Sequence, residues 1–570
     1  MVPFISLLVI FFLSLVEGKL NYLKFYFLAA DSFYYFSVAT EKIFSFDNVY
    51  LTNGYHPLWQ IFLVLLNIVG VSKSSMITTA LLMNMFFLTV SLFIFYKMFY
   101  ERIKSNPSIL FLIVPGSQFL FLIFTNRQNY LHFFSFLNGM ESSLTILLVT
   151  LLIFSLRKKY FNEIYVGFLL LMIVLTRLDN IFLLFTYSLF KIYKSKKLLH
   201  KEIVISSIGI AFYLILNKYY FGTYLPVSGL TKSSFSLLHN YSIIFNIFIS
   251  KIEFTLNAFN KNIFQDSLFW RIIQVFFPLS FSIYFYFVIK KFKIIKSYFT
   301  DVLLMFVALK STYYFFTSNF WTQGHWYFPA SFVILSFLLV EYSSELKKII
   351  DVESFIKSIA IILGINWFVL LFYSLTNNYQ KSIDLFEIIY IPVLIIIVSS
   401  SLILITSFFY ISIFAFKRKK LIFTIYLTCI TFIQVNHYIN SNYHYGYFQF
   451  YEQRHEINSS LEKIKNFNNK ILSFDDGIVN YYLDSEVMNG LKLSIDSDAY
   501  FRSKSESIYD IAYSRGYRYF GSLNYLSDFD LIEGSHFMDD KSFNKYDIKT
   551  VYESNNNNFI LFQFIEEFDD

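Results

Sequence analysis

The chain has 570 residues, of which 56% are hydrophobic and 15% are charged, and its formal net charge is +7. Because about a quarter of the residues of an average soluble protein are charged, this composition excludes an ordinary soluble enzyme. The apolar residues form blocks long enough to cross a bilayer, which predicts a polytopic membrane protein.

The N-terminal segment and the cysteine content set two further limits. The first apolar run, at residues 3–17, lacks a basic leading region and a small-residue cleavage site, so we expect a retained span and not a signal peptide. Cys429 is the single cysteine. One cysteine allows neither an intrachain disulfide nor a cysteine-based metal site.

Clusters of Lys and Arg between the apolar blocks predict the orientation, because short cytoplasmic loops accumulate these residues. Two crossings fit between successive clusters, which gives thirteen spans with the N-terminus inside and every cluster on the cytoplasmic side. The segment Leu58 to Val71 must then enter the membrane without crossing it, or lie at its surface. The spans are predicted at residues 3–17, 76–98, 108–125, 141–156, 161–176, 179–193, 202–217, 268–290, 299–318, 326–342, 354–375, 385–415 and 420–437.

The last quarter of the chain differs in charge from the rest. Residues 452–570 contain 22 acidic and 12 basic residues, whereas residues 1–451 contain 18 acidic and 35 basic residues. The net charge therefore changes from +17 to −10, which marks a domain boundary. We expect an all-α polytopic membrane domain at residues 1–437 and a soluble domain at 438–570 on the outer side of the membrane.

Short apolar strands alternate with helical segments in this C-terminal part, which favours a small α/β domain. The predicted strands are Lys470 to Phe474, Glu486 to Leu491, Tyr517 to Leu523 and Phe559 to Phe564. The predicted helices are Ile478 to Leu483 and Ile508 to Arg515.

The first external loop, at residues 18–75, carries Asp31 directly after the first apolar segment. The residues that follow are spaced as in an amphipathic helix on the membrane surface. Asp31 would occupy the N-cap or first turn of this helix, where a carboxylate is locally satisfied. That capping role does not account for the polar and aromatic run TNGYHPLW at Thr52 to Trp59 in the same loop.

Other polar residues are expected on the same outer face, each with two readings. Glu141 fits a helix N-terminus for reasons of the helix dipole alone, or it contacts a substrate. Arg177 either pairs with Asp179 across a tight hairpin or faces an anionic group, since charges at membrane depth are commonly functional. Lys218 and Lys232 are either solvated or bind an anion, and His56 and His325 are either structural or catalytic.

Together these residues resemble the GT-C superfamily, integral-membrane glycosyltransferases that use polyprenyl-phosphate sugars. The acid after the first span, the paired tyrosines and the TNGYHPLW run resemble a bacterial group with a TNG-aromatic-HPLW motif. The likeness to arabinofuranosyl-, aminoarabinose- and protein mannosyl-transferases is more distant. The runs NGMES at 138–142, LTRLD at 175–179, FGTYLPVSGLTK at 221–232 and FDDGIVNYYLD at 474–484 are also similar to that group. One departure is Ser32, where the family commonly has a second acid.

The resemblance implies a GT-C-like fold of about thirteen transmembrane helices and roles for twelve residues. Asp31 would act as the general base that takes a proton from the acceptor hydroxyl, with inversion at the anomeric carbon. The catalytic set is Asp31, His56 and Glu141; the donor phosphate would be bound by Arg177, Lys218 and Lys232; and acceptor or sugar contacts would come from Tyr35, Asn53, Tyr55, Trp59, Tyr220 and His325.

The expected partners are a polyprenyl-phosphate sugar donor, a lipid or glycan acceptor and the lipid bilayer, with no nucleic acid. The residues do not establish a cofactor, although Asp31 and Glu141 could hold Mg²⁺ or Mn²⁺ through carboxylate oxygens. The expected location is a bacterial inner membrane, with the active site and the C-terminal domain extracytoplasmic.

Two other functions compete with the transferase. A transporter or flippase of a lipid-linked glycan is disfavoured because the sequence has no inverted repeat and no span broken near its midpoint by paired Gly or Pro. A scaffold that keeps the fold without catalysis is the second alternative, and Ser32 in place of an acid favours it.

Overall fold

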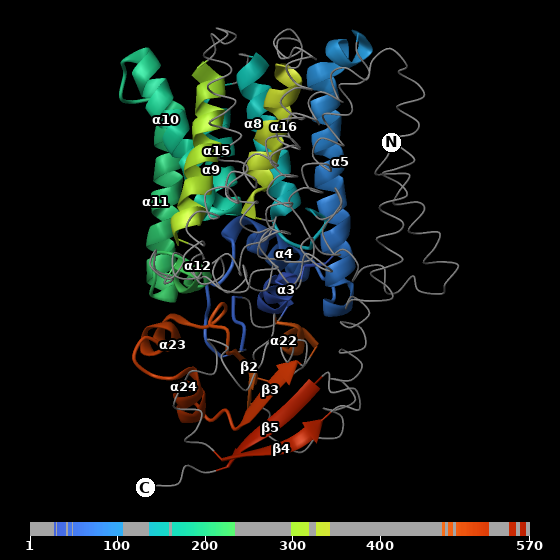
Figure 1. The fold of residues 1–570 in the computed structure, drawn as a ribbon, viewed down its shortest axis with the longest axis vertical. Helices are drawn as coiled ribbons and strands as arrows, with labels where there is room; N and C mark the ends of the chain where they lie inside the picture. The colour runs from blue at the N-terminus through green and yellow to red at the C-terminus, as the bar shows by residue number, and fades with distance from the viewer. Residues whose placement is uncertain are drawn as a thin grey trace, which may run out of the picture.

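The structure is a computed structural model, and Figure 1 shows a bundle of helices with a small β-sheet domain at one end. The described part of the chain is thus mostly helical with a small sheet. The structure describes residues 28–29, 31–40, 44–47, 49–105, 136–158, 162–233, 298–317, 327–342, 470–473, 477–482, 486–523, 547–553 and 559–565.

The helical part contains ten α-helices and one 3₁₀ turn among the described residues. Their bounds are α3 Ser32–Thr40, α4 Pro57–Ile68, α5 Lys73–Ser105, α8 Ser142–Lys158, α9 Glu163–Thr176, η3 Leu178–Asn180, α10 Ile181–Ser195, α11 Lys201–Phe221, α12 Val227–Ser233, α15 Tyr298–Thr317 and α16 Pro329–Glu341.

Local sequence signals account for several helix ends. Pro57 begins α4, where its missing N–H and fixed φ cost nothing. The Asn162 side chain caps α9 by accepting from the Ile164 N–H at 3.0 Å. Gly222 ends α11 with a φ of 73°, and its N–H donates to the Lys218 carbonyl.

The described helices run in both directions along the bundle, which has two distinct ends (Figure 1). We call the end next to the sheet the domain end, where α8, α10 and α16 begin and α9, α11 and α15 finish. We call the opposite end the basic end. There Arg102 of α5 and Arg157 of α8 both form ion pairs with Glu341 of α16, at 3.4 and 3.3 Å.

Seven of the thirteen predicted spans coincide with described helices, namely α5, α8, α9, α10, α11, α15 and α16. Two helices, at Lys73–Arg102 and Lys201–Phe221, are long and apolar enough to cross a membrane. Their outer faces carry exposed apolar side chains, such as Phe86 and Phe212. The predicted spans at 3–17, 108–125, 268–290, 354–375, 385–415 and 420–437 lie outside the described residues, so the number of thirteen stays a prediction.

The segment Leu58 to Val71 lies mostly in the short helix α4, which begins at Pro57 within the TNGYHPLW run. The 12 residues of α4 rise about 18 Å, less than the roughly 30 Å of a bilayer core. Both flanks of α4 contact the C-terminal domain, since Thr52 Oγ1 donates to the Ile495 carbonyl and Tyr481 donates to the Lys73 carbonyl. The chain therefore enters and leaves α4 at the domain end, and the position of this segment relative to a membrane stays a prediction.

The expectation of an amphipathic surface helix after Asp31 is wrong. Every residue of α3 from Ser32 to Ala39 is buried. The helix packs against α4 and α5 and also against α22 of the C-terminal domain, where Phe33 and Phe36 both contact the Tyr481 ring. The surface prediction failed because a segment more than 400 residues away in the sequence covers this helix.

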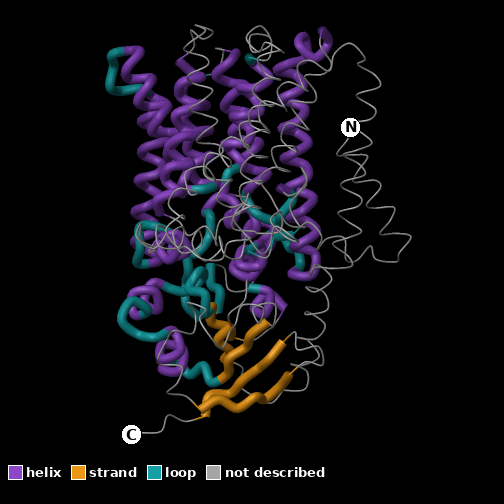
Figure 2. Tube along the Cα trace, in the orientation of Figure 1, coloured by secondary structure: helices purple, strands orange, loops and turns teal. Residues whose placement is uncertain are grey.

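The C-terminal domain has a five-stranded mixed sheet in the order β2-β1-β3-β5-β4 (Figure 2). Strand β1 pairs parallel with β2 and β3, and β5 pairs antiparallel with β3 and β4. The elements are β1 Lys470–Ser473, α22 Ile478–Tyr482, β2 Glu486–Asn489, α23 Ser497–Arg502, α24 Ile508–Ser514, β3 Tyr519–Leu523, β4 Asp547–Glu553 and β5 Phe559–Ile565. All four predicted strands and both predicted helices are present, while α23 and β4 were not predicted.

The two faces of this sheet pack against different partners, because successive side chains of a strand point to opposite sides. Leu472 and Met488 face a core formed with α23 and α24. Ile471 and Val487 face the other way and belong to the same buried cluster as α3 and the bundle. The C-terminal domain and the helical bundle therefore share one continuous apolar core.

A close backbone contact fixes the loop before α4 against the C-terminal domain. A Cβ added to Gly54 would lie 2.0 Å from the Leu493 carbonyl oxygen, so only glycine permits this approach. Nearby, Thr231 Oγ1 of α12 donates to the Lys492 carbonyl at 3.0 Å. The TNG run thus joins the bundle to the domain.

Candidate active site

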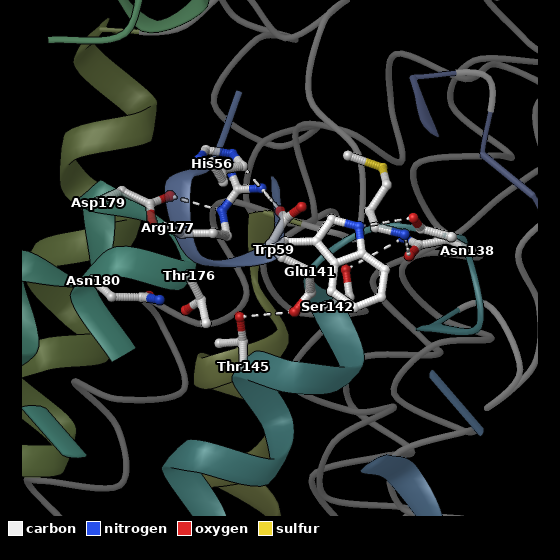
Figure 3. Close-up of polar contacts among 12 residues, drawn as sticks. His56, Trp59, Asn138, Glu141, Ser142, Thr145, Thr176, Arg177, Asp179 and Asn180 are labelled. Carbon is white, nitrogen blue, oxygen red and sulfur yellow. Dashed lines mark hydrogen bonds and ion pairs between the residues drawn. The ribbon is translucent and has the colours of Figure 1, made fainter. Parts of the chain in front are cut away.

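Charged side chains from three segments converge at the domain end of the bundle. Glu141 directly precedes α8, Arg177 and Asp179 lie between α9 and α10, and Lys310 comes from α15. Figure 3 shows Arg177 between Glu141 and Asp179, with His56 beside it. We call Glu141, Arg177, Asp179 and Lys310 the buried charge cluster.

Arg177 is the centre of this cluster. Its Nη1 lies 2.6 Å from Glu141 Oε1 and its Nε lies 3.4 Å from Asp179 Oδ2. The guanidinium carbon lies 4.5 Å from the centre of the Tyr327 ring, a cation–π contact. Because the Arg177 side chain is only 3% exposed, its charge is taken up by partners within the fold.

Asp179 joins the cluster to α15. Lys310 Nζ lies 3.2 Å from Asp179 Oδ1 and donates to Asn180 Oδ1 at 2.7 Å. Tyr314, one turn further along α15, donates to Asp179 Oδ2. Two carboxylates thus balance two cations among the described residues, which is the condition for burying charge at tolerable cost.

His56 connects this cluster to a more exposed region. Its Nε2 lies 3.7 Å from Glu141 Oε1, and its side chain is 23% exposed whereas Glu141 is fully buried. The neighbouring Trp59 donates from Nε1 to the Gly139 carbonyl at 3.0 Å (Figure 3). This bond ties the start of α4, next to His56, to the turn that carries Glu141.

Asp31 lies on the turn before α3, next to the turn that carries Glu141. The Ala29 N–H donates to the Asn138 carbonyl at 3.0 Å, and Ser32 Oγ donates to the Ala29 carbonyl at 2.6 Å. Ser32 therefore closes the turn that holds Asp31. Asp31 is half-buried, in contrast to the fully buried Glu141.

The charges of two carboxylates, those of Glu141 and Asp31, act on the Tyr35 hydroxyl. Burial raises the pKa of the Tyr35 hydroxyl well above its usual value, and the charges of Glu141 and Asp31 raise it further, against Arg177. Its ring lies 6.3 Å from that of His56. Asp31, His56 and Glu141, predicted as one catalytic set, are therefore brought to neighbouring positions around Tyr35.

Three other predicted sugar-binding residues have partners within the protein. Asn53 Nδ2 donates to Thr223 Oγ1 at 2.9 Å, and Asn53 Oδ1 accepts from the Val227 N–H at 3.0 Å. The Tyr55 ring stacks on Phe44, and Trp59 is fully buried. Through these contacts the TNGYHPLW run, which includes the start of α4, joins the segment after α3 to the turn before α12.

The remaining predicted residues lie apart from the cluster or outside the described residues. Lys218 is exposed on α11, where its Nζ donates to the Gly222 carbonyl at 2.7 Å and so caps the helix end. Tyr220 is 60% exposed on the same helix. His325 and the side chain of Lys232 lie outside the described part of the chain.

Lys310 and Tyr314 were missed in the sequence, although a signal was present. A lysine within the apolar segment 299–318 is costly in a membrane and needs a partner. The spacing of four residues places Lys310 and Tyr314 on one face of α15. A charged residue inside a predicted span could therefore have pointed to Asp179 as its partner.

The predicted site for Mg²⁺ or Mn²⁺ would use the carboxylates of Asp31 and Glu141. One Glu141 oxygen accepts a hydrogen bond from Arg177. The metal site itself stays a prediction.

Comparison with protein-family models, with curated proteins and with solved structures found no match. The assignment of function therefore depends on the site itself.

Proposed function

We propose that the protein is a membrane glycosyltransferase that moves a sugar from a polyprenyl-phosphate donor to an extracytoplasmic glycan or glycolipid. One observation supports it above the others: Asp31, His56, Glu141 and Arg177 come from four separate sequence motifs and converge at the domain end of the bundle. A soluble-type domain covers that same end.

In this proposal Asp31 takes the proton of the acceptor hydroxyl as its oxygen attacks the anomeric carbon. The bond from that carbon to the phosphate oxygen breaks, and the polyprenyl phosphate leaves with the negative charge. Asp31 suits the role of base because it is half-buried, so that a substrate can reach it while water is partly excluded.

The other residues of the candidate site also differ in their exposure to solvent, and we assign their roles accordingly. Glu141 is fully buried and held by Arg177, so we assign both as positioning residues that fix His56. Arg177 thereby takes a different role from the phosphate contact predicted from the sequence, since its charge is balanced by Glu141 and Asp179. His56 is the partly exposed group that can face the donor phosphate.

The location follows from the two ends of the bundle. The described parts of the basic clusters, at residues 97–104, 157–158 and 191–201, fall at the end opposite the C-terminal domain, and such clusters favour the cytoplasmic side. We therefore place the C-terminal domain and the candidate site outside a bacterial inner membrane, in a multi-pass arrangement.

The activity is tested with full-length protein in nanodiscs, given radiolabelled polyprenyl-phosphate sugars and envelope glycolipids. Asp31→Asn should lower transfer by at least about 100-fold, the usual size of a general-base contribution. Glu101→Gln, a change of an exposed carboxylate at the basic end, is the matched control and should leave transfer unchanged.

Each other outcome has a definite meaning. Transfer by Asp31→Asn at the wild-type rate would exclude Asp31 as the base. Lipid scrambling by both forms without transfer would identify a transporter, and a folded protein with neither activity would identify a scaffold.

The orientation is tested by single-cysteine labelling in a Cys429→Ser background. Ser505→Cys places a thiol on an exposed turn of the C-terminal domain, and Lys197→Cys places one in the exposed loop at the basic end. An impermeant maleimide should label only the first in intact cells. Labelling of only the second would reverse the proposed topology.

A further inference from the structure

Three metal-ligating side chains meet at the basic end of the bundle, far from the candidate active site. Glu163, His200 and Glu202 each offer one ligand atom, and these atoms all lie within 4.8 Å of one another. We propose that they form a binding site for a divalent transition-metal ion. This inference does not depend on the proposed glycosyltransferase activity.

The start of two adjacent helices creates this arrangement. Asn162 caps α9, so Glu163 is its first residue, and His200 occupies the N-cap of α11, two residues before Glu202. Gly167 lies one turn after Glu163 on the same face of α9. A Cβ on Gly167 would lie 2.9 Å from the Glu202 Cα, so this glycine lets α11 approach closely enough to bring the three side chains together.

Glu202 supplies the observation that points to a cation. Its side chain is 1% exposed, and its Oε1 accepts from Tyr187 at 3.1 Å and pairs with Lys191 Nζ at 2.8 Å. Its Oε2 is also buried and has no hydrogen-bond partner among the described residues. Because a buried carboxylate oxygen without a partner is costly, a metal ion next to Oε2 would remove that cost.

His200 is held in an orientation suited to a ligand. One ring nitrogen, Nε2, lies 2.7 Å from Ser195 Oγ. The hydrogen bond fixes the ring and leaves Nδ1 as the nitrogen available to a metal, an arrangement that commonly orients ligand histidines. The ion pair with Lys191 and the helix dipole stabilise the charge of Glu202 at this position. They account neither for the burial of its second carboxylate oxygen, Oε2, nor for the position of the His200 imidazole beside it.

The ligand set and its surroundings select the ion. One imidazole with two carboxylates suits Zn²⁺ or Mn²⁺ better than Mg²⁺ or Ca²⁺, which prefer oxygen ligands alone. Lys191 and the lysines near it, such as Lys194 and Lys201, repel weakly held cations. Zn²⁺ should therefore bind more tightly than Mn²⁺, and Mg²⁺ should not compete.

The test uses full-length protein in nanodiscs, purified without a histidine tag and treated with a chelator. Zn²⁺, Mn²⁺ and Mg²⁺ are titrated by calorimetry, and bound metal is counted by mass spectrometry. Wild type should bind one equivalent of Zn²⁺. Glu163→Gln and His200→Ala should each weaken binding by at least about tenfold, while the control Glu101→Gln should not.

A further variant separates a metal site from a plain ion pair. Lys191→Met removes a competing cation, so it should tighten Zn²⁺ binding if Glu202 is a ligand. Zn²⁺ should also raise the melting temperature of wild type and not of Glu163→Gln. Equal binding by wild type, Glu163→Gln and His200→Ala would show adventitious metal only, and either that result or the absence of Zn²⁺ binding would overturn the proposal.

Discussion

The buried charge cluster at the domain end and the group of Arg102, Arg157 and Glu341 at the basic end hold their charges in different ways. At the domain end, Glu141, Arg177, Asp179 and Lys310 are each at most 9% exposed and balance one another. At the basic end, Arg102 and Arg157 are about a third exposed and share the single carboxylate of Glu341. A partly exposed cation loses little hydration free energy on folding, so its position can reflect membrane orientation alone. A buried ion needs partners of opposite charge within the fold, and a cluster of such ions therefore forms a defined site.

The largest expected effect comes from removing one buried ion. Arg177→Met leaves Glu141 and Asp179 buried with fewer partners, which should lower the free energy of unfolding by about 3–5 kcal/mol. Arg157→Met at the basic end should lower it by no more than about 1 kcal/mol. Both values are measured by denaturant unfolding in micelles, and equal losses would erase the distinction between the two ends.

The next effect tests the contact between the TNG loop and the C-terminal domain. Gly54→Ala places a methyl group 2.0 Å from the Leu493 carbonyl oxygen, and such overpacking should cost about 1–3 kcal/mol. Limited proteolysis should then release the C-terminal domain faster. Gly229→Ala is the matched control, because a Cβ there meets nothing within 4 Å and alanine favours the helix.

A third experiment uses pH at the same interface. Burial raises the pKa of the Asp47 carboxyl, and Asp496 and Glu486 raise it further, against the N–H groups of Val49 and Tyr50. A raised pKa means that the contribution of this group to stability is present below its unfolded pKa, about 3.9, and is lost as the pH rises through the folded value.

Asp47→Asn should therefore stabilise the protein at pH 7 and reduce the gain in stability on acidification. Asparagine keeps the oxygen that accepts from Val49 and Tyr50, so the turn should survive. Unfolding curves between pH 7 and pH 4 measure the difference. A variant that is less stable than wild type at pH 7 would contradict the assignment.

The smallest expected effect is at Lys218, which the sequence predicted as a phosphate ligand. Its Nζ caps α11 and lies 5.7 Å from the centre of the Tyr224 ring. Because this side chain is exposed, Lys218→Ala should change stability by less than about 1 kcal/mol and leave sugar transfer unaltered. A loss of transfer comparable to that of Asp31→Asn would show that Lys218 contacts the donor after all.

Helices and strands with a strong apolar pattern could be predicted from the sequence to within a few residues. The spans at 141–156 and 161–176 correspond to α8 and α9, and the predicted strand at 470–474 corresponds to β1. Strand β4, with the sequence DIKTVYE, was missed because it is a polar edge strand whose pairing with β5 is not visible locally. Helix α23 was missed because it is a segment of only six residues without a clear apolar pattern, capped by Asp496.

The sequence by itself determined the charge asymmetry, the two-part organisation and the grouping of polar motifs, because these depend on composition and local spacing. Only the tertiary structure decided that α3 is buried beneath α22 and that Arg177 pairs with Glu141 as well as with Asp179. It also decided that Lys310 completes the cluster. These contacts join segments tens to hundreds of residues apart, and the cost of burying an unpaired charge selects such partners only once the helices have packed.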